Sequence, residues 1–441
     1  MQDWLWMGAG ALGRGIAAGT IDPRDLCEAY LDAIAASDEA DRIYARTTAE
    51  RARAEAAAAA ERAKAGLRRG PLDGVPVSWK DLFDTGEVAT EAGSALLKGR
   101  VPQDDAAVVA TATAGGAVCL GKTHTSELAF SGLGLNPVTA TPPNRHDPAL
   151  VPGGSSSGAA ASLAFGLAPL AIGSDTGGSV RTPAAWNDLV GLKTTAGRIP
   201  CDGVVPLVES FDTVGPLARS VEDAGLALAL LEGTRPPDLS GATLEGTRLL
   251  VLEPYVESSR DAPRHAFAHA RSRFEAAGAE IRSEAVPTVA AAMDLAGVLF
   301  TPEAYGTWRE TIEAAPHLMY APILERFRSG AAASGADVMA AWRRLRGLRA
   351  DYARATAGYD AVILPTVMSL PPDRERLTTD AAYYVDENLA ALRNTRIGNL
   401  MGLCGLTLPT GVPSCGVMAL AGPMQEARLL RLGTAMETAL A

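Results

Sequence analysis

Three short segments of this chain carry side chains suited to covalent chemistry. Lys80 follows the apolar run 75–79, Ser155 lies in the glycine- and serine-rich loop 152–158, and Ser179 comes directly after two glycines. Hydrolysis of an acyl bond needs a nucleophile, a base that activates it and a group that carries its proton to the leaving atom. A lysine and two serines in this order can fill these roles, so the sequence predicts a hydrolytic site.

The segment that carries Ser179 also offers backbone donors. Gly177 and Gly178 allow a sharp turn, so that the N–H groups of Thr176, Gly177, Gly178 and Ser179 can converge on one oxygen. Removing one donor from such an oxyanion hole typically costs about 2.7–4 kcal/mol of transition-state stabilisation. We therefore predict that these four residues form the oxyanion hole.

Lys80 is the candidate base. A lysine at the end of an apolar strand is partly buried, and burial lowers a lysine pKa towards neutrality. Taken alone, Lys80 would be read as a surface residue and the loop around Ser155 as a turn or helix cap. The combination of the three segments favours catalysis over these structural readings.

The same segments resemble the motifs of the amidase signature family. The resemblance covers nearly the whole chain and extends to residues 191–194, 202–206, 215–223, 359–366 and 399–403. It implies an α/β fold, a single large domain over residues 1–441 with a central mixed, twisted β-sheet covered by helices on both faces. It also implies cleavage of linear amides or carbamates without a cofactor or a metal ion.

Matching positions in the motifs imply a role for each residue. Ser179 is expected to form the acyl-enzyme, Ser155 to relay its proton after a cis peptide bond from Gly154, and Lys80 to accept that proton. The expected supporting residues are Ser156, Ser174, Asp175 and Arg181. Asp175 and Arg181 are read as structural rather than as substrate contacts.

Three other motif matches fail on context. Residues 116–123 fit the P-loop pattern, but their four variable positions are apolar and read as a strand. Residues 8–13 fit a dinucleotide-binding pattern without the preceding strand that such a site needs. Residues 154–158 fit a nucleophile elbow around Ser156, but the downstream histidines do not lie in loops that would complete a triad.

Composition and residue spacing limit the classes of partner and ligand that we expect for this chain. The formal net charge of −11 argues against a nucleic-acid partner, which requires a basic surface. The five cysteines are scattered, and neither a CxxC pair nor an HExxH motif indicates a metal site. No apolar run is long enough for a membrane span and the start lacks a signal-peptide pattern. We expect a cytoplasmic monomer or homodimer that acts on a small molecule.

The elements that must position the site follow from apolar patterning. Residues 1–70 are predicted to form N-terminal helices, with one long helix over 44–64 and an N-cap near Asp22. Residues 71–230 are predicted to form the catalytic core, and residues 231–360 a helical subregion around the substrate pocket. Residues 361–441 are predicted to add further strands to the sheet. The predicted strands are 75–79, 117–120, 168–172, 249–252, 361–366 and 406–409, with a helix over 158–167.

Substrate choice is assigned to the helical insert 287–330 and to residues 129–135. The apolar character of these segments predicts a mainly apolar acyl or aryl substrate with an amide, anilide or carbamate (urethane) bond. Two alternatives stay open, a biuret- or carboxybiuret-type hydrolase and a glutamine-amidotransferase A-type subunit. The candidate pocket residues are Ala129, Gly132, Leu133, Tyr305, Trp308, Met319 and Cys404, the last standing where the family often has proline.

Overall fold

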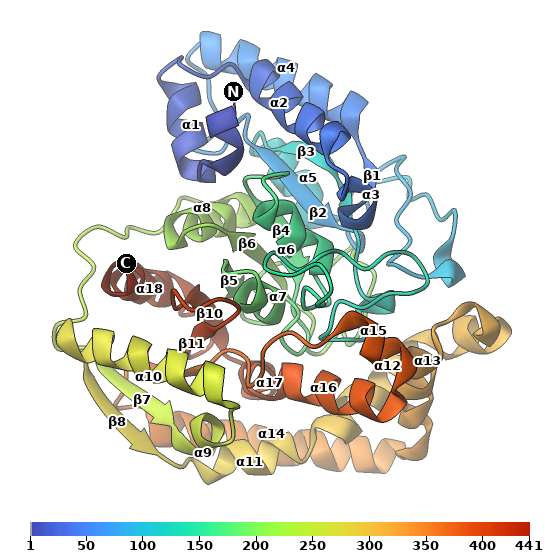
Figure 1. Cartoon of the computed structure of the whole chain (residues 1–441), viewed down its shortest axis with the longest axis vertical. Helices are drawn as coiled ribbons and strands as arrows, with labels where there is room; N and C mark the ends of the chain where they lie inside the picture. Colours follow the sequence, from blue (N-terminus) through green and yellow to red (C-terminus); the bar gives the residue numbers. More distant parts are fainter. Residues whose placement is uncertain (1) are drawn as a thin grey trace.

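One mixed β-sheet organises the computed structural model, which describes residues 2–441 (Figure 1). Its strands are β1 (Tyr44–Thr47), β2 (Pro76–Lys80), β3 (Val118–Thr123), β4 (Ala171–Ser174), β5 (Val190–Lys193), β6 (Val214–Ala218), β7 (Arg248–Leu252), β8 (Glu280–Glu284), β9 (Ala361–Pro365), β10 (Cys404–Pro409) and β11 (Gly416–Ala421). Their order in the 11-stranded sheet is β1-β3-β2-β4-β6-β5-β10-β11-β9-β7-β8.

The sheet combines parallel and antiparallel pairs. β2 runs parallel to β3 and β4, and β7 runs parallel to β8 and β9, whereas β10 pairs antiparallel with both β5 and β11. The C-terminal strands thus join the catalytic core to the strands that follow residue 247. This mixed sheet in one α/β domain confirms the predicted fold class.

Side chains of successive strand residues enter two separate cores, one on each face of the sheet. In β7, Leu249 and Val251 pack into one hydrophobic cluster, and Leu250 and Leu252 pack into the other. The first cluster is covered by α1 (Ala9–Ala17), α2 (Pro23–Ala36), α4 (Ala49–Lys64), α5 (Ala107–Ala114), α6 (Ser157–Ala164), α8 (Val221–Glu232), α10 (Asp261–Ala276) and α18 (Glu426–Leu440). Helices on both faces explain why most strands are apolar throughout.

The second core lies under the helical insert and the helices that precede β10. It is covered by α9 (Glu253–Glu257), α11 (Pro287–Met293), α12 (Ala296–Ala314), α13 (Ala321–Arg328), α14 (Gly335–Thr356), α15 (Arg374–Thr379), α16 (Ala381–Arg393) and α17 (Arg396–Leu400). In Figure 1, α1, α2 and α4 lie at the top of the molecule, and α11 and α14 lie at the bottom. Two short helices remain, α3 (Ala40–Ile43) and α7 (Arg181–Trp186).

The prediction of one helix over residues 44–64 is wrong at its start. Residues 44–47 form the edge strand β1, antiparallel to β3, and the helix α4 begins at Ala49. Tyr44 is buried and its hydroxyl donates to Leu167 O at 3.0 Å, so tertiary contacts override the helical propensity of this stretch. The predicted cap is confirmed, because the Asp22 side chain accepts from Arg24 N at 2.9 Å.

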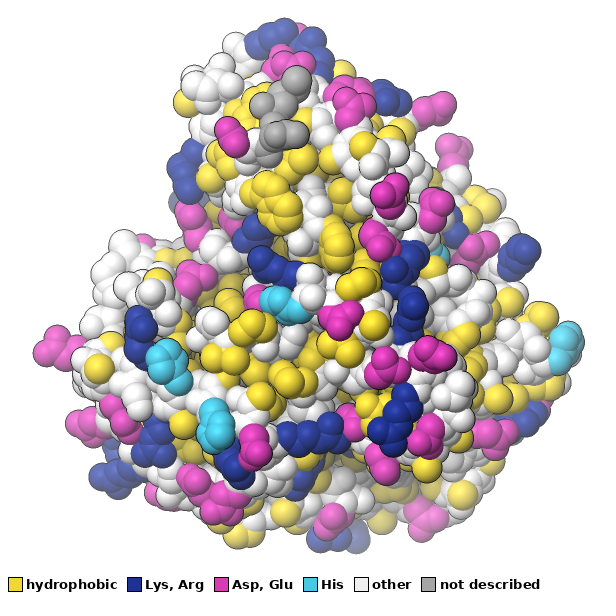
Figure 2. Space-filling view, in the orientation of Figure 1, with side chains coloured by type: hydrophobic (Ala, Val, Ile, Leu, Met, Phe, Trp, Pro, Cys, Tyr) yellow, Lys and Arg dark blue, Asp and Glu magenta, His cyan; other side chains and the backbone are white. Residues whose placement is uncertain are grey.

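The predicted strands lie where expected, with shifted ends. The stretch that fits the P-loop pattern leads into β3, and its residues 118–123 are buried in the sheet rather than arranged around a phosphate site. No helix within residues 2–441 is both long and apolar enough to cross a bilayer. Figure 2 shows basic and acidic side chains intermingled over the face in view.

Candidate active site

Lys80 ends β2 in the interior of the sheet and is fully buried. Its Nζ donates to Ser155 Oγ at 2.7 Å and to Ser174 Oγ at 2.8 Å. Burial lowers the pKa of Lys80 to about 7, although the carboxylates of Asp212 and Asp175 oppose this shift. A neutral Lys80 amine is therefore well populated at neutral pH, and its lone pair can accept a proton from Ser155.

The loop before α6 holds Ser155 in a fixed position. The Gly154–Ser155 peptide bond is cis, and Ser155 O accepts hydrogen bonds from Thr125 Oγ1 at 2.8 Å and from Ser126 N at 3.2 Å. A Cβ atom on Gly154 would lie 2.6 Å from Gly134 N, so only glycine fits this position. The loop thus packs against its neighbours through its backbone, and the Ser155 hydroxyl contacts Lys80.

Ser179 lies beside this loop, at the entrance to α7. Its carbonyl accepts from Ser156 N at 3.1 Å, and the residue is only 5% exposed. Within residues 2–441 the Ser179 hydroxyl makes no hydrogen bond, and none joins it to Ser155. The structure therefore brings Lys80 and Ser155 into direct contact and places Ser179 nearby, on the wall of an open cavity.

Ser156 and Ser174 connect the two serine loops. Ser156 Oγ donates to Ser174 O at 3.2 Å, and Ser174 N donates to Ser156 Oγ at 3.3 Å. Because Ser174 Oγ also contacts Lys80, these bonds hold the lysine, the loop that carries Ser155 and the end of β4 in one network. Both residues thus support the geometry of Lys80.

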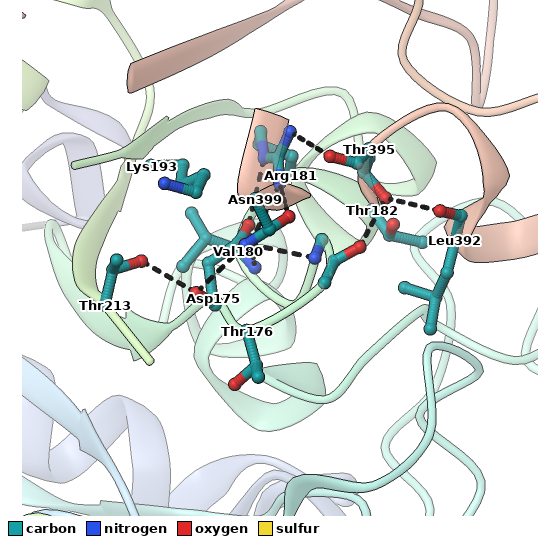
Figure 3. Close-up of polar contacts among 12 residues, drawn as sticks. Asp175, Thr176, Val180, Arg181, Thr182, Lys193, Thr213, Leu392, Thr395 and Asn399 are labelled. Atoms are coloured by element: carbon teal, nitrogen blue, oxygen red, sulfur yellow. Dashed lines mark hydrogen bonds and ion pairs between the residues drawn. The ribbon is translucent and has the colours of Figure 1, made fainter. Parts of the chain in front are cut away.

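A buried ion pair fixes the segment that carries Ser179 (Figure 3). Arg181 Nη2 donates to Asp175 Oδ1 at 2.9 Å, and the same oxygen accepts from Gly178 N at 2.8 Å. Both charged side chains are fully buried. Burial alone would raise the pKa of Asp175, but the charge and hydrogen bonds of Arg181 outweigh it and lower the pKa to about 2. The pair thus holds the backbone of the turn that leads to Ser179.

The Ser179 segment is also tied to the residues just before α17. Arg181 Nη1 donates to Thr395 O at 2.7 Å, and Thr395 Oγ1 donates to Gly177 O at 2.8 Å. Gly178 has a φ of 136°, and a Cβ atom there would lie 2.0 Å from Thr395 Oγ1. The turn therefore needs glycine for its backbone conformation and for the close approach of Thr395.

The predicted backbone donors are not equivalent. The Gly178 N–H is already bound to Asp175, because that side chain folds back over the turn, and it is not available to an oxyanion. The N–H groups of Thr176, Gly177 and Ser179 find no acceptor in the part of the chain that the structure describes. These remaining donors can bind an oxygen that carries developing negative charge.

Two cavities meet at the Ser179 segment and share Ala129, Thr176 and Leu207. The first, which we term the nucleophile cavity, has a volume of about 270 Å³ and contains Ser179 in its wall. The second, the acidic cavity, has a volume of about 410 Å³, and its wall contains Ser174, Asp202, Glu209 and Asp212. A substrate whose carbonyl lies at Ser179 can extend its two ends from this junction into the two cavities.

Of the residues predicted for the pocket, Ala129 lines both cavities. The others lie outside the two linings. Trp308 Nε1 donates to Pro206 O at 2.9 Å, and the Tyr305 hydroxyl donates to Glu313 Oε1 at 3.2 Å. The remaining residues are buried in the packing around the site, namely Gly132, Leu133, Met319 and Cys404.

Three residues at the site were not singled out from the sequence. Asp212 accepts hydrogen bonds from the Thr176 hydroxyl and from Leu207 N, and burial raises its pKa. Arg326 of α13 and Arg396 of α17 line the nucleophile cavity. Nothing in the local sequence distinguishes these arginines from surface residues, because only the fold brings both helices to Ser179. Among the described residues no cluster of His, Cys, Asp and Glu could hold a metal ion.

Comparisons with known proteins identify the family to which this chain is similar. The Amidase family model matches residues 25–430. The 2-amino-5-chloromuconic acid deaminase of Comamonas testosteroni is 35% identical over 405 residues, which cover 88% of this chain and 86% of the relative. The A-type subunit of glutamyl-tRNA(Gln) amidotransferase from Anaeromyxobacter sp. (strain K) is 33% identical over 479 residues, covering 98% of this chain and 96% of that protein.

A solved structure is also similar over almost the whole chain. The native peptide amidase from Stenotrophomonas maltophilia superposes with a TM-score of 0.81 at 28% identity, covering 98% of this chain and 96% of that one. Fold and comparisons together define an α/β amide hydrolase. The chain belongs to the amidase family, also described as the amidase signature family.

Proposed function

We propose that this protein is a serine hydrolase that cleaves C–N bonds of amides, anilides or carbamates through an acyl-enzyme on Ser179. The observation that carries this proposal is the contact between the buried Lys80 amine and the Ser155 hydroxyl at 2.7 Å. A lysine without its charge at neutral pH is a competent base, and a serine in contact with it is a proton carrier rather than a helix cap.

The reaction starts with proton transfer from Ser179 through Ser155 to neutral Lys80. Ser179 Oγ attacks the substrate carbonyl, and the oxyanion is stabilised by the N–H groups of Thr176, Gly177 and Ser179. The proton held on Lys80 then returns through Ser155 to the leaving nitrogen, and the C–N bond breaks. Water attacks the acyl-enzyme by the same proton route and releases the acid.

Formation of the Ser155–Ser179 hydrogen bond accompanies substrate binding in this mechanism. Catalytic hydrogen bonds are often long in the unliganded enzyme and tighten only in the complex. The Ser156 N–H bond to Ser179 O supports this, since it holds the two serine loops next to each other at 3.1 Å.

The substrate is proposed to have an apolar body. Leu207, Ala296, Phe300 and Leu392 give the nucleophile cavity a largely apolar wall, which favours an acyl or aryl group. A biuret- or carboxybiuret-type substrate lacks the apolar carbon chain that this wall favours, and its turnover is the competing outcome in a substrate screen.

A second candidate function is that of a glutamine-amidotransferase A-type subunit. It is favoured by the similarity to the A-type subunit of glutamyl-tRNA(Gln) amidotransferase over 98% of this chain. In that case the isolated chain would hydrolyse glutamine poorly, and added partner subunits would stimulate the reaction. Robust turnover of simple amides by the isolated chain, as a monomer or homodimer, supports the hydrolase instead.

The test is a panel of para-nitroanilide, amide, carbamate and ester substrates with Ser179→Ala as the blank. The hydrolase proposal predicts turnover of at least one class, lost in the blank. Turnover that persists in Ser179→Ala and is lost in Ser156→Ala would overturn the proposal and restore the nucleophile-elbow interpretation.

A further inference from the structure

The nucleophile cavity contains two arginines and no acidic residue. Arg326 and Arg396 line it together with Ser179, and none of its lining residues is Asp or Glu. Within residues 2–441, neither guanidinium forms an ion pair, whereas Arg181 beside Ser179 is paired with Asp175. Two neighbouring cations without a carboxylate partner in one partly buried cavity favour the binding of an anionic ligand.

Arg326 is held in place by groups that leave its charge uncompensated. Its Nη1 donates to Phe130 O at 2.8 Å, and the guanidinium carbon lies 4.1 Å from the centre of the Phe130 ring. A guanidinium has five N–H donors, so most of those on Arg326 are unused. None of its unpaired nitrogens is sealed from solvent, which leaves them accessible from the cavity that Arg326 lines.

Arg396 is positioned by the same contacts that fix the nucleophile. It follows Thr395, whose hydroxyl donates to Gly177 O and whose carbonyl accepts from Arg181. The Arg396 guanidinium itself makes no hydrogen bond to any described residue, and its nitrogens are likewise open to solvent. The backbone anchor of the Ser179 turn and a free guanidinium therefore belong to adjacent residues, Thr395 and Arg396.

Both arginines remain charged at neutral pH. Burial lowers the pKa of each to about 10, and the charge of Arg326 contributes to the lowering at Arg396. The acidic cavity on the other side of Thr176 has the opposite character, with Asp202, Glu209 and Asp212 in its wall. An anionic group is thus attracted to one cavity and repelled from the other.

We infer that Arg326 and Arg396 form a carboxylate-binding subsite, so that the preferred substrate is an amide whose molecule also carries a carboxylate. This inference rests on the proposed hydrolase function and narrows its substrate class. The planar guanidinium fork matches a carboxylate in a bidentate manner, and the apolar wall receives the chain that links the carboxylate to the amide. Small dicarboxylic acid monoamides and N-acyl amino acids are the two classes that fit.

The test compares kcat/KM for charged amides with that for uncharged isosteres in which an isopropyl group replaces the carboxylate. One pair carries the carboxylate on the acyl half and the other on the amine half, so the better pair shows which half occupies the cavity. We expect at least one charged amide to be preferred by about 10- to 100-fold, mainly through KM. Preference for the uncharged isostere in both pairs would overturn the inference.

The variants Arg326→Met and Arg396→Met assign the preference to the subsite. Each should reduce the ratio of charged to uncharged kcat/KM by about 10-fold or more. The matched control is Arg393→Met, which removes a guanidinium three positions earlier, over the Tyr255 ring and outside the cavity lining. Arg393→Met should keep the wild-type ratio, and a ratio also unchanged in Arg326→Met and Arg396→Met would contradict the inference.

A binding measurement separates this inference from the hydrolase proposal. Ser179→Ala has an intact subsite, and calorimetry should detect glutarate binding to it. Adding Arg396→Met to the same variant should weaken this binding by about 10-fold or more. If no amide of any kind is turned over, the hydrolase proposal fails, yet this binding still tests the subsite. Absence of glutarate binding to Ser179→Ala, together with equal turnover of charged and uncharged amides, would refute the subsite alone.

Discussion

The Nζ atom of Lys80 lies 2.7 Å from Ser155 Oγ, in a part of the protein where both side chains are fully buried. This contact joins the end of a central strand to a loop far away in the sequence. It depends on burial, because the same lysine in water would be protonated and unable to accept a proton. The contact is the structural basis for the first prediction.

Removing the three central side chains should reduce activity in a defined order. We expect Ser179→Ala and Lys80→Ala to lower kcat by about 10⁵-fold or more, and Ser155→Ala by about 10⁴-fold, since residues that act as a unit fail together. Steady-state kinetics on the best amide of the panel provide the measurement. Ser157→Ala is the matched control, because Ser157 is equally buried in the same loop but its hydroxyl donates to His124 O.

The pH dependence should report the state of Lys80. Because burial lowers its pKa to about 7, the amine is protonated below that pH and cannot act as a base. Consequently kcat/KM should rise tenfold per pH unit below about 7 and level off above it. The pKa of Glu127 is also raised to about 7 by burial, so Glu127→Gln is needed as a control. This variant should retain the acidic limb of the profile, that is, the rise of kcat/KM below about pH 7. Loss of the limb in Glu127→Gln would contradict the assignment to Lys80.

Breaking the Asp175–Arg181 pair should destabilise the fold. Both partners are fully buried, so Asp175→Ala leaves an unpaired guanidinium in the core and should cost about 3–5 kcal/mol in the free energy of unfolding. Denaturant unfolding measures this cost. The exposed pair between Arg14 and Glu222 provides the comparison, and Glu222→Ala should cost less than about 1 kcal/mol. Equal costs for the two variants would show that the buried pair is not a structural support.

The turn before Ser179 should tolerate a side chain at one glycine and not at the other. At Gly178 a Cβ atom would lie 2.0 Å from Thr395 Oγ1 in a left-handed backbone conformation, whereas at Gly177 nothing lies within 4 Å. We expect Gly178→Ala to lower the free energy of unfolding by about 2 kcal/mol or more, and Gly177→Ala by less than about 1 kcal/mol. Thermal and denaturant unfolding of the two variants test this difference.

The sequence was sufficient to predict which residues meet at the candidate site, because they lie in contiguous motifs. Lys80, Ser155 and Ser179 each lie next to glycines or at the end of an apolar run, and these local patterns specify a strand end or a sharp turn. The mixed sheet was predicted for a similar reason, since its buried strands are short apolar runs. The edge strand β1 was missed, because pairing with β3 and not local propensity determines its conformation.

The walls of the pocket could not be predicted in the same way. Arg326 and Arg396 lie on separate helices and reach Ser179 only through packing between segments that are remote in the sequence. Trp308 and Met319 were assigned to the pocket for their apolar character, but the same character buries them in the second core. Apolar side chains in a helical insert can serve either purpose, and their sequence pattern does not separate the two.

The central claim is that Ser179 becomes acylated. The most direct measurement is tandem mass spectrometry of the enzyme quenched during turnover of a para-nitrophenyl ester, with localisation of the acyl group within the peptide that contains Ser155, Ser156 and Ser179. The proposed mechanism predicts an adduct on Ser179 that accumulates in Lys80→Ala only slowly. An adduct on Ser155 or Ser156, with Ser179 unmodified, would contradict it.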